Sequence, residues 1–397
     1  PRSRGLGDVY KRQIQKDIVS GIIVALVSIP ISMGYAQIAG LPAVYGLYCS
    51  ILPVLIYGLV TSSPQFVFGV DATPAALVGG TLATLGIVSG SEEAKAVVPA
   101  ITLVAALWLL LFFFIKAGRI VNYISTPVMG GFISGIGVTI ILMQAAKLFG
   151  GNAGTGEAIQ LVMHIAGEFD SFNLLSAVLG VGTVVIILVA KKFIPKFPMS
   201  VLLMVLGALA TVFFHIDRFG VKLLPHVDKG LPGFSLPDMS VVFKNPSEII
   251  LLGLSVAGVV MAQTLLATNN YANKYGYKVS NNREILAYAA ANAASAVIGG
   301  CPLNGSVSRT GIADQFGCKS QFMSITASLT MLLIVLFGTP VLEYLPVPIL
   351  TGIVVAALIG ITEFGLAVKL WKTDHTEFAI FVGAFSVSYT HLTLPTN

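Results

Sequence analysis

Residues 299–321, GGCPLNGSVSRTGIADQFGCKSQ, interrupt a chain that otherwise consists largely of long apolar stretches. Glycine, proline and asparagine break the run at 299–305, and the apolar stretch that follows, 305–317, is too short to cross a hydrocarbon core of ~30 Å. Broken helices of this kind are tolerated in membranes where they line a cavity or are covered by protein. The segment therefore predicts a discontinuous helix inside a polytopic membrane protein.

The composition of the chain agrees with this reading. Of 397 residues, 55% are hydrophobic and 10% are charged, and the mean hydropathy is +0.88. Soluble domains carry roughly 25% charged residues, so a water-soluble globular protein is excluded. Three cysteines, an odd number, do not suggest a disulfide scaffold. We predict apolar spans at 18–39, 44–60, 71–88, 97–115, 128–148, 173–190, 199–215, 249–268, 284–299, 305–317, 320–337 and 346–363, and a truncated one from about 377.

The two ends of the chain differ from the sequence between them. They are 1–13, PRSRGLGDVYKRQ, and 387–397, VSYTHLTLPTN. One DNA element, read from its two strands, can encode both Asp-Val-Tyr-Lys-Arg-Gln and Val-Ser-Tyr-Thr-His. We therefore expect two adapter-derived tails and exclude them from the fold. Without them the chain has 19 basic and 17 acidic residues, a net charge of +2 instead of +5, which gives no sign of a nucleic-acid partner.

Basic residues predict the orientation in the cell membrane, since Lys and Arg concentrate on the cytoplasmic side. With a cytoplasmic N-terminus, twelve of them fall in cytoplasmic connections and six on the opposite side. The polar segment 216–248 is predicted to be an extracytoplasmic loop. The six residues on that outer side are Lys95, Lys147, Arg218, Lys222, Lys229 and Lys244.

Two interrupted segments occupy matching positions in the two halves of the chain. The run 61–74, TSSPQFVFGVDATP, and the run 299–308, GGCPLNGSVS, each form the third element of their half. Paired interruptions of this kind are the best sequence indication of a transporter's binding site near the midplane. Two unrelated loops remain the alternative.

Arg309 is the strongest candidate for a binding residue. An arginine within a membrane span is costly unless it faces a cavity or a counter-ion. It lies at the start of a short helix, where free backbone N–H groups favour an anion, and Ser306, Ser308 and Thr310 add hydroxyl groups. This combination predicts an oxyanion site. The alternative is a structural ion pair of Arg309 with Asp71 or Asp314.

Three further polar positions are candidates for the same site. Asp71 is expected to cap the helix 71–88 and is a candidate for binding a coupling proton or Na⁺, although a role as a cap alone is equally compatible with the sequence. Gln263 and Thr264 are further candidates for coupling; they lie in an apolar helix, where an amide also serves to join helices. Tyr35 is expected either to line the cavity or to pack. No nucleotide-binding loop, metal-ligand spacing or nucleophile motif occurs, so neither an enzyme nor a cofactor or metal site is predicted.

Two stretches of the chain resemble a known family. The stretch 17–48, DIVSGIIVALVSIPISMGYAQIAGLPAVYGLY, and the stretch 299–321 resemble the first and tenth helices of the SulP (sulfate permease) anion transporters. The resemblance implies an all-α fold of fourteen segments in two inverted seven-helix repeats that form a core and a gate domain. It places the first repeat at 14–215 and a second, truncated repeat at 249–386.

The resemblance also implies a site and a mechanism. Ser308 and Arg309 match the family's anion-binding pair, Ala72 and Thr73 match its third-helix site, and Tyr35 matches its first-helix aromatic residue. An elevator-like secondary transporter of sulfate-like anions, bicarbonate or dicarboxylates follows, as a homodimer in the lipid bilayer.

The chain departs from the family at several positions. Ile31 replaces the glutamine that often follows the proline of the first helix, and Gly69-Val70 replaces a common Gly-Pro. Gln263 stands where many bacterial members have Glu, which leaves coupling to H⁺ or Na⁺ open. An uncoupled exchanger or channel, a nucleobase-type carrier of the same fold and a membrane sensor are the alternatives.

Overall fold

The computed structural model describes residues 2–119, 125–154, 158–168, 171–194, 197–224, 230–231, 233–234 and 236–390, without the side chains of 2–12, 158, 361 and 388–390. Residue 1 and residues 391–397 of the expected tails lie outside these ranges, as do 225–229, 232 and 235 of the predicted loop 216–248.

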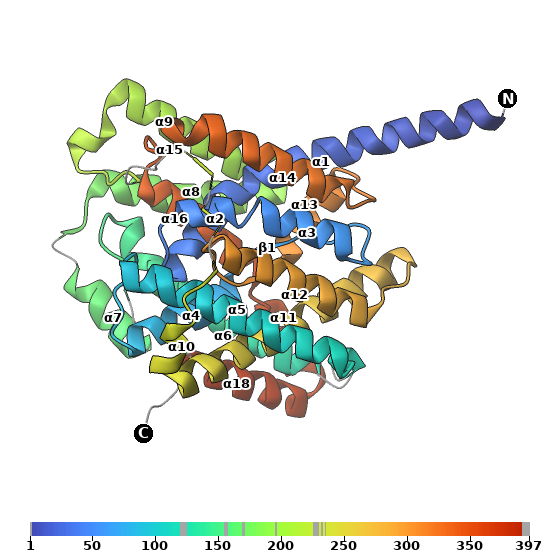
Figure 1. The fold of residues 1–397 in the computed structure, drawn as a ribbon. Helices are drawn as coiled ribbons and strands as arrows, with labels where there is room; N and C mark the ends of the chain where they lie inside the picture. The colour runs from blue at the N-terminus through green and yellow to red at the C-terminus, as the bar shows by residue number, and fades with distance from the viewer. Residues whose placement is uncertain are drawn as a thin grey trace.

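Helices dominate the described chain (Figure 1). Seven of its helical segments are long and apolar enough to cross a membrane, and three shorter apolar ones accompany them. Their bounds are α1 (Arg2–Ile38), α2 (Val44–Tyr48), α3 (Leu52–Val60), α4 (Ala72–Thr84), α5 (Glu92–Phe114), α6 (Thr126–Leu148), α7 (Ala158–Gly167), α8 (Leu174–Phe193), α9 (Met199–Phe214), α10 (Ser240–Lys244), α11 (Pro246–Tyr275), α12 (Asn281–Val297), α13 (Val307–Gln315), α14 (Phe322–Leu333), α15 (Thr339–Leu342), α16 (Val347–Ile361), α17 (Phe364–Thr373) and α18 (His375–Thr390).

Each predicted apolar span contains a helix, with two informative differences. Helix α17 follows α16 directly, in a stretch whose Lys369 and Lys372 had suggested a connection. Helix α11 continues to Tyr275, seven residues beyond the predicted end at 268, because its last turns are polar but still helical. Pro30 does not end α1, which continues to Ile38 and passes the proline as one helix.

A short two-stranded sheet joins the two halves of the chain. Strand β1 (Phe68–Val70) pairs antiparallel with β2 (Leu303–Gly305), so that Gly69 lies opposite Asn304. Helix α4 follows β1, and α13 follows β2 after one residue. The interrupted segments predicted at matching positions are therefore in direct contact.

The two half-helices run from this sheet toward opposite sides. The turn after α4 meets the end of α1, where the Gly90 N–H donates to the Gly40 carbonyl at 2.8 Å. The end of α13 meets the first part of the candidate membrane span of α1 (Gln13–Ile38), where the Ser20 hydroxyl donates to the Ala313 carbonyl at 3.4 Å. Because α1 spans the protein, α4 and α13 point away from each other, as inverted repeats require.

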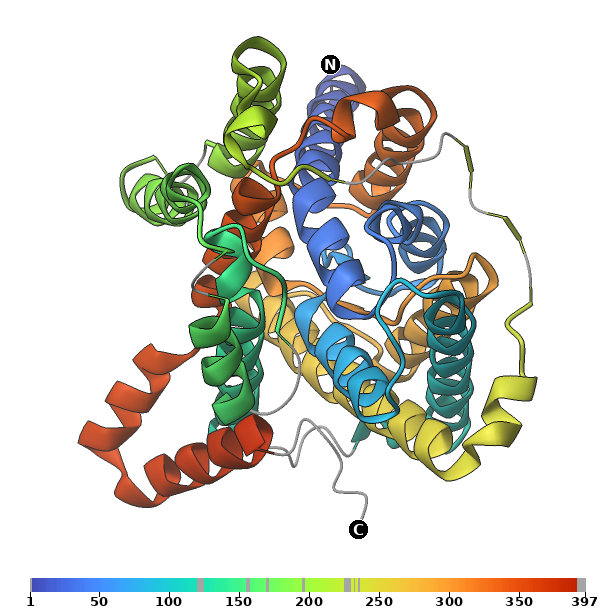
Figure 2. The same ribbon diagram turned by 90° about the vertical axis from the view of Figure 1, so that its left-hand side faces the viewer.

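The helices form two packed groups. Helices α1 to α5 pack with α11 to α14, whereas α6 and α8 pack with α16 and α18. Figure 2 shows the second group, with α6 and α8 in green beside the red C-terminal helices, at one side of the molecule. We call the first group the core and the second the gate. They meet mainly where α1 contacts α16 and where α4 contacts α6.

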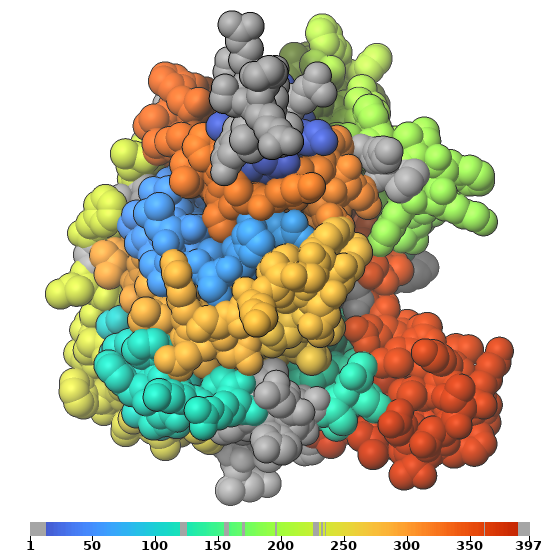
Figure 3. All heavy atoms as spheres, turned by 90° about the vertical axis from the view of Figure 1, so that its right-hand side faces the viewer, coloured from blue at the N-terminus to red at the C-terminus, as the bar shows by residue number. Residues whose placement is uncertain are grey.

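On the face drawn in Figure 3, segments of the first half of the chain (blue) lie beside segments of the second half (orange). The carboxylate of Glu284, fully buried at the start of α12, accepts hydrogen bonds from the Thr61 hydroxyl at 2.8 Å and from the Ser62 and Ser63 N–H groups at 2.6 and 3.0 Å. Tyr57 donates to the same carboxylate at 3.3 Å. Glu284 thereby fixes the segment that leads into β1.

Candidate functional site

The centre of the core is formed by the first turns of α4 and α13. The residues before these helices, Asp71 and Ser306, have extended backbones (φ −141° and −109°), so each helix begins abruptly beside the paired strands. The first N–H groups of a helix lack intrahelical partners and carry the positive end of its dipole. Two such ends in one place form a site that favours an anion.

Arg309 brings a full positive charge to this place. Its side chain is 2% exposed. One guanidinium nitrogen, Nη2, donates to the Val70 carbonyl at 2.7 Å, and Nη1 donates to the Ser28 hydroxyl at 3.4 Å, whereas Nε has no partner among the described residues. The guanidinium therefore joins α13 to β1 and to α1.

The structural ion pair that the sequence left as an alternative is not formed. Among the described residues, no carboxylate oxygen lies within 4.0 Å of the Arg309 guanidinium. Asp314 is instead bound to Lys274 at 3.1 Å and accepts a hydrogen bond from the Tyr275 hydroxyl. Asp71 is the carboxylate that interacts with Arg309 electrostatically, without direct contact. The charge of Arg309 is therefore not neutralised by a contacting acid.

Gly69 makes the position of Arg309 possible. A Cβ atom at this residue would lie 2.9 Å from Nη1 and 3.3 Å from Nη2 of Arg309. The guanidinium consequently rests directly on the backbone of β1. Where many family members have Gly-Pro, this chain has Gly69-Val70, so the proline is replaced but the glycine is retained.

Asn304 is a central residue that the sequence analysis missed as a site residue. It is fully buried on β2, and its Nδ2 donates to Gln263 Oε1 at 2.7 Å and to Asp71 Oδ2 at 3.4 Å. Its Oδ1 accepts from the Thr264 hydroxyl at 2.6 Å. The sequence did contain a signal for this role. Asn304 lies between Leu303 and Gly305 in the interrupted segment, and an amide that is buried there requires hydrogen-bond partners.

This network defines the roles of the three coupling candidates in the present state. The Thr264 hydroxyl also accepts from the Gly305 N–H at 2.9 Å, so it fixes β2 to α11. Gln263 has its oxygen occupied by Asn304. Asp71 holds the N-cap position of α4 as predicted, but its side chain makes no capping hydrogen bond. Within the described part of the chain, the carboxylate of Asp71 has one side-chain hydrogen bond, the long contact with Asn304.

The remaining predicted residues surround the same centre. Ala72 and Thr73 are buried in the first turn of α4. Tyr35, on α1, is 3% exposed and interacts electrostatically with both Asp71 and Arg309. These positions therefore belong to one constellation, although they come from different helices.

The three hydroxyl residues of α13 differ in what they can offer an anion. Ser308 is partly exposed, and its Oγ lies 3.4 Å from the Ser306 Oγ. The Thr310 hydroxyl donates to the Ser306 carbonyl at 2.6 Å and accepts from the Val67 N–H at 2.9 Å. Thr310 thus holds β1 against α13, while Ser306 and Ser308 keep hydroxyls free of backbone partners.

A comparison with protein families identifies the family of this chain. Residues 14–384 match the model of the sulfate permease family. The chain belongs to this family. Similar proteins include the low affinity sulfate transporter 3 of Stylosanthes hamata, 29% identical over 94% of the chain, and the sulfate transporter 3.1 of Arabidopsis thaliana, 26% identical over 94% of the chain. The chain spans about three fifths of the length of these relatives, 61% and 58%.

Solved structures confirm the fold class. The chain matches the structure of SLC26A9 with a TM-score of 0.86 at 22% identity, covering 96% of this chain and 63% of that one. It matches the transmembrane domain of the cyanobacterial bicarbonate transporter BicA with a TM-score of 0.81 at 18% identity, covering 95% and 96% of the two chains. The predicted all-α membrane fold with two inverted repeats is thereby confirmed, and the family is one of transporters, not enzymes.

Proposed function

We propose that this protein is a secondary active transporter of small anions, with sulfate-like anions, bicarbonate and dicarboxylates as the candidate substrates. The observation that carries the proposal is the buried Arg309, which has no contacting carboxylate and lies beside the converging N-termini of α4 and α13. A buried charge of this kind requires compensation, and a bound anion would supply it. A neutral nucleobase would not.

The transport cycle that fits this arrangement is an elevator-like movement of the core against the gate. The anion site lies entirely within the core, on β1, β2, α4 and α13, whereas the gate contributes α6, α8, α16 and α18. A core that moves as one body would carry the site past the gate without taking it apart. The orientation with a cytoplasmic N-terminus, the homodimer and residence in the cell membrane remain part of the proposal.

Asp71 is the residue that we propose for binding the coupling H⁺ or Na⁺. Its carboxylate lacks the capping contact that would commit it to a structural role. An uncoupled exchanger is the second candidate, and the observation that favours it is Gln263, an amide that cannot change its charge.

The experiment is uptake of labelled sulfate and labelled bicarbonate into proteoliposomes by the wild type and by Arg309→Ala. Losing one partner of a buried charge-assisted contact typically costs about 2–5 kcal/mol, so anion affinity is expected to fall by at least thirtyfold. Arg283→Ala is the matched control, because Arg283 also donates to a backbone carbonyl, that of Val60, but is exposed.

Anion affinity that is unchanged in Arg309→Ala would refute the proposed site. The thermal midpoint of the purified variant in detergent shows whether a loss of anion affinity comes from the missing charge in a folded protein or from a loss of the fold. A variant that no longer folds would show that Arg309 serves mainly to join α13 to β1.

A further inference from the structure

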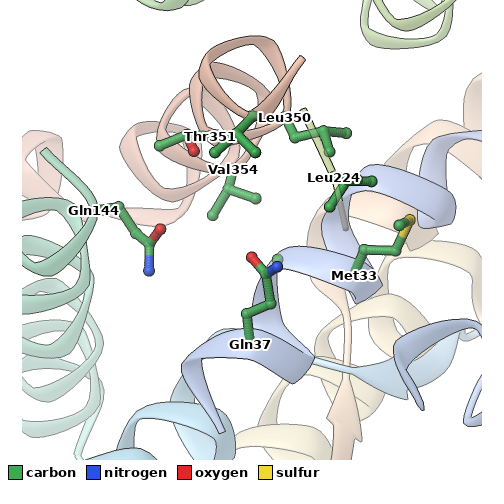
Figure 4. Close-up of a pocket in the computed structure, with 9 residues that line it drawn as sticks. Met33, Gln37, Gln144, Leu224, Leu350, Thr351 and Val354 are labelled. Atoms are coloured by element: carbon green, nitrogen blue, oxygen red, sulfur yellow. The ribbon is translucent and has the colours of Figure 1, made fainter. Parts of the chain in front are cut away.

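A small cavity lies at the contact between core and gate, with two amide side chains among its mostly apolar lining. It is lined by residues of α1, α6 and α16 and by Leu224, and Figure 4 shows the amides of Gln37 and Gln144 pointing toward the same gap. Its lining is distinct from that of the site around Arg309. It is close to the end of α1, on the side where α4 ends.

Gln144 has no structural explanation in the present state. It is 5% exposed, it belongs to α6, and no hydrogen bond is formed by its side-chain amide within the described part of the chain. Buried amides are nearly always paired with protein or water. An amide without a protein partner that is aimed into a cavity is therefore free to bind a ligand that enters in another state.

Lys147 supplies a positive charge at the same place. It follows Gln144 by three residues, so both lie on the same face of α6. Its Nζ donates to Gln37 Oε1 at 3.3 Å, which is a contact between gate and core, and no carboxylate lies within 4.0 Å of it among the described residues. The amide oxygen of Gln37 thus accepts the hydrogen bond of a lysine that has no carboxylate partner in the described part of the chain.

A second lysine lies near Lys147. Lys222 donates to the Gly151 carbonyl at 3.3 Å and to Asn152 Oδ1 at 3.0 Å, and it is close enough to Lys147 for the two charges to interact. Glu168, an acidic residue on this side, accepts hydrogen bonds from the N–H groups of Asn152 and makes no ion pair with either lysine. Lys147, which donates to Gln37 of the lining, therefore has a second lysine near it.

We propose that Lys147, Gln37 and Gln144 form an outer binding site for the transported anion, which fills when core and gate separate on this side. This proposal rests on the proposed function. The cavity now measures about 10 Å³, room for a single water molecule, so an oxyanion does not fit in the closed state. In the closed state Gln37 takes the place of the anion on Lys147, and in the open state the anion displaces it.

The test is uptake of labelled sulfate, with labelled bicarbonate as a second probe, into proteoliposomes in which the anion is offered to one side at a time. Lys147→Gln is expected to raise KM at least tenfold for anion offered on the side of this cavity. It should leave KM for the opposite side unchanged, and Lys147→Arg should retain the wild-type value. Lys95→Gln is the matched control, since Lys95 lies on the same side but is already paired with Glu92 at 2.7 Å.

An unchanged KM in Lys147→Gln, or an equal rise for both sides, would overturn the outer site while leaving the proposed function intact. Should Lys147→Gln fail to fold, Gln144→Glu gives the same information, because it places a nearly isosteric negative charge in the cavity and is expected to raise KM on this side only. A wild type that takes up neither anion would overturn the proposed function and the outer site with it.

Discussion

At the scale of the residue, the site depends on how four polar side chains share their hydrogen bonds. Asn304 uses both ends of its amide, toward Gln263 and Asp71 with its nitrogen and toward Thr264 with its oxygen. Because the Gln263 oxygen is thereby occupied, the amide nitrogen of Gln263 is the end left for other partners. Asn304 thus orients a donor on α11 as well as fixing β2.

Asp71→Asn tests the coupling role at this scale. Removing the ionisable group is expected to abolish the dependence of anion uptake on an imposed H⁺ or Na⁺ gradient while anion exchange continues, since an amide cannot take up a proton and binds cations weakly. Asn and Asp are comparable at an N-cap, so α4 should remain intact. Uptake is measured with and without each gradient.

Glu363→Gln is the control for this measurement, because Glu363 belongs to the gate, outside the constellation around Arg309. Gradient dependence that is retained in Asp71→Asn, or absent in the wild type, would favour the uncoupled exchanger.

At the scale of the element, the position of β1 is fixed from both ends. Arg309 and Thr310 hold it from α13, and Glu284 holds the preceding segment 61–63 from α12. Tyr57, Phe68 and Tyr288 stack behind it, with ring centroids 4.8 Å apart for the first pair and 5.2 Å for the second. A strand of only three residues is stable here because the contacts from α12 and α13 and the stacked rings hold its backbone in place.

Glu284→Ala is expected to destabilise the protein strongly. It removes a buried acceptor and leaves the donors of Thr61, Ser62 and Ser63 without a partner, and hydrogen bonds to charged groups contribute about 1.5–3 kcal/mol each. The thermal midpoint in detergent should fall by several degrees. Glu92→Ala serves as the control, because its pair with Lys95 is exposed and such pairs contribute at most about 1 kcal/mol. Equal midpoints for the two variants would contradict the role of Glu284.

The sequence predicted the elements of this site better than their contacts. Apolar length and the Gly/Pro interruptions predicted the half-helices, and the cost of an intramembrane arginine singled out Arg309. Strands of three residues have no detectable period, so the pairing of Phe68–Val70 with Leu303–Gly305 was beyond prediction. The partners of Arg309 are a backbone carbonyl and Ser28, and neither carries a charge that a pattern could reveal.

At the scale of the whole molecule, the contact between core and gate determines which conformation is present. Lys147 and Gln37 join α6 to α1, and a Cβ atom on Gly34 would lie 2.5 Å from Val354 of α16. The two groups of helices are thus closely packed at the end of α1. Movement of the core must break this contact.

Replacing both Gln37 and Lys147 by cysteine tests that movement. A short bifunctional thiol reagent is expected to join the two residues and to stop uptake. Cleavage of the link should return uptake to the level of the unlinked double variant, whose KM for anion offered on this side is itself expected to be raised. The native thiols should contribute little, because Cys49, Cys301 and Cys318 are buried and burial raises the pKa of the Cys318 thiol to about 12, which keeps it protonated at pH 8. Unaffected uptake in the cross-linked protein would exclude a relative movement of core and gate at this contact.

The pairing of β1 with β2 also has a consequence for biosynthesis. Asp71 and Asn304, which meet at the centre, are separated by 233 positions in the chain. The ribosome therefore releases α4 and the unpaired edge of β1 long before their partners exist, and an open strand edge is not tolerated in lipid. The first half of the protein must keep this edge covered, by its own helices or by a chaperone, until α13 has been synthesised. Assembly of the core therefore cannot be completed before β2 and α13 have been synthesised.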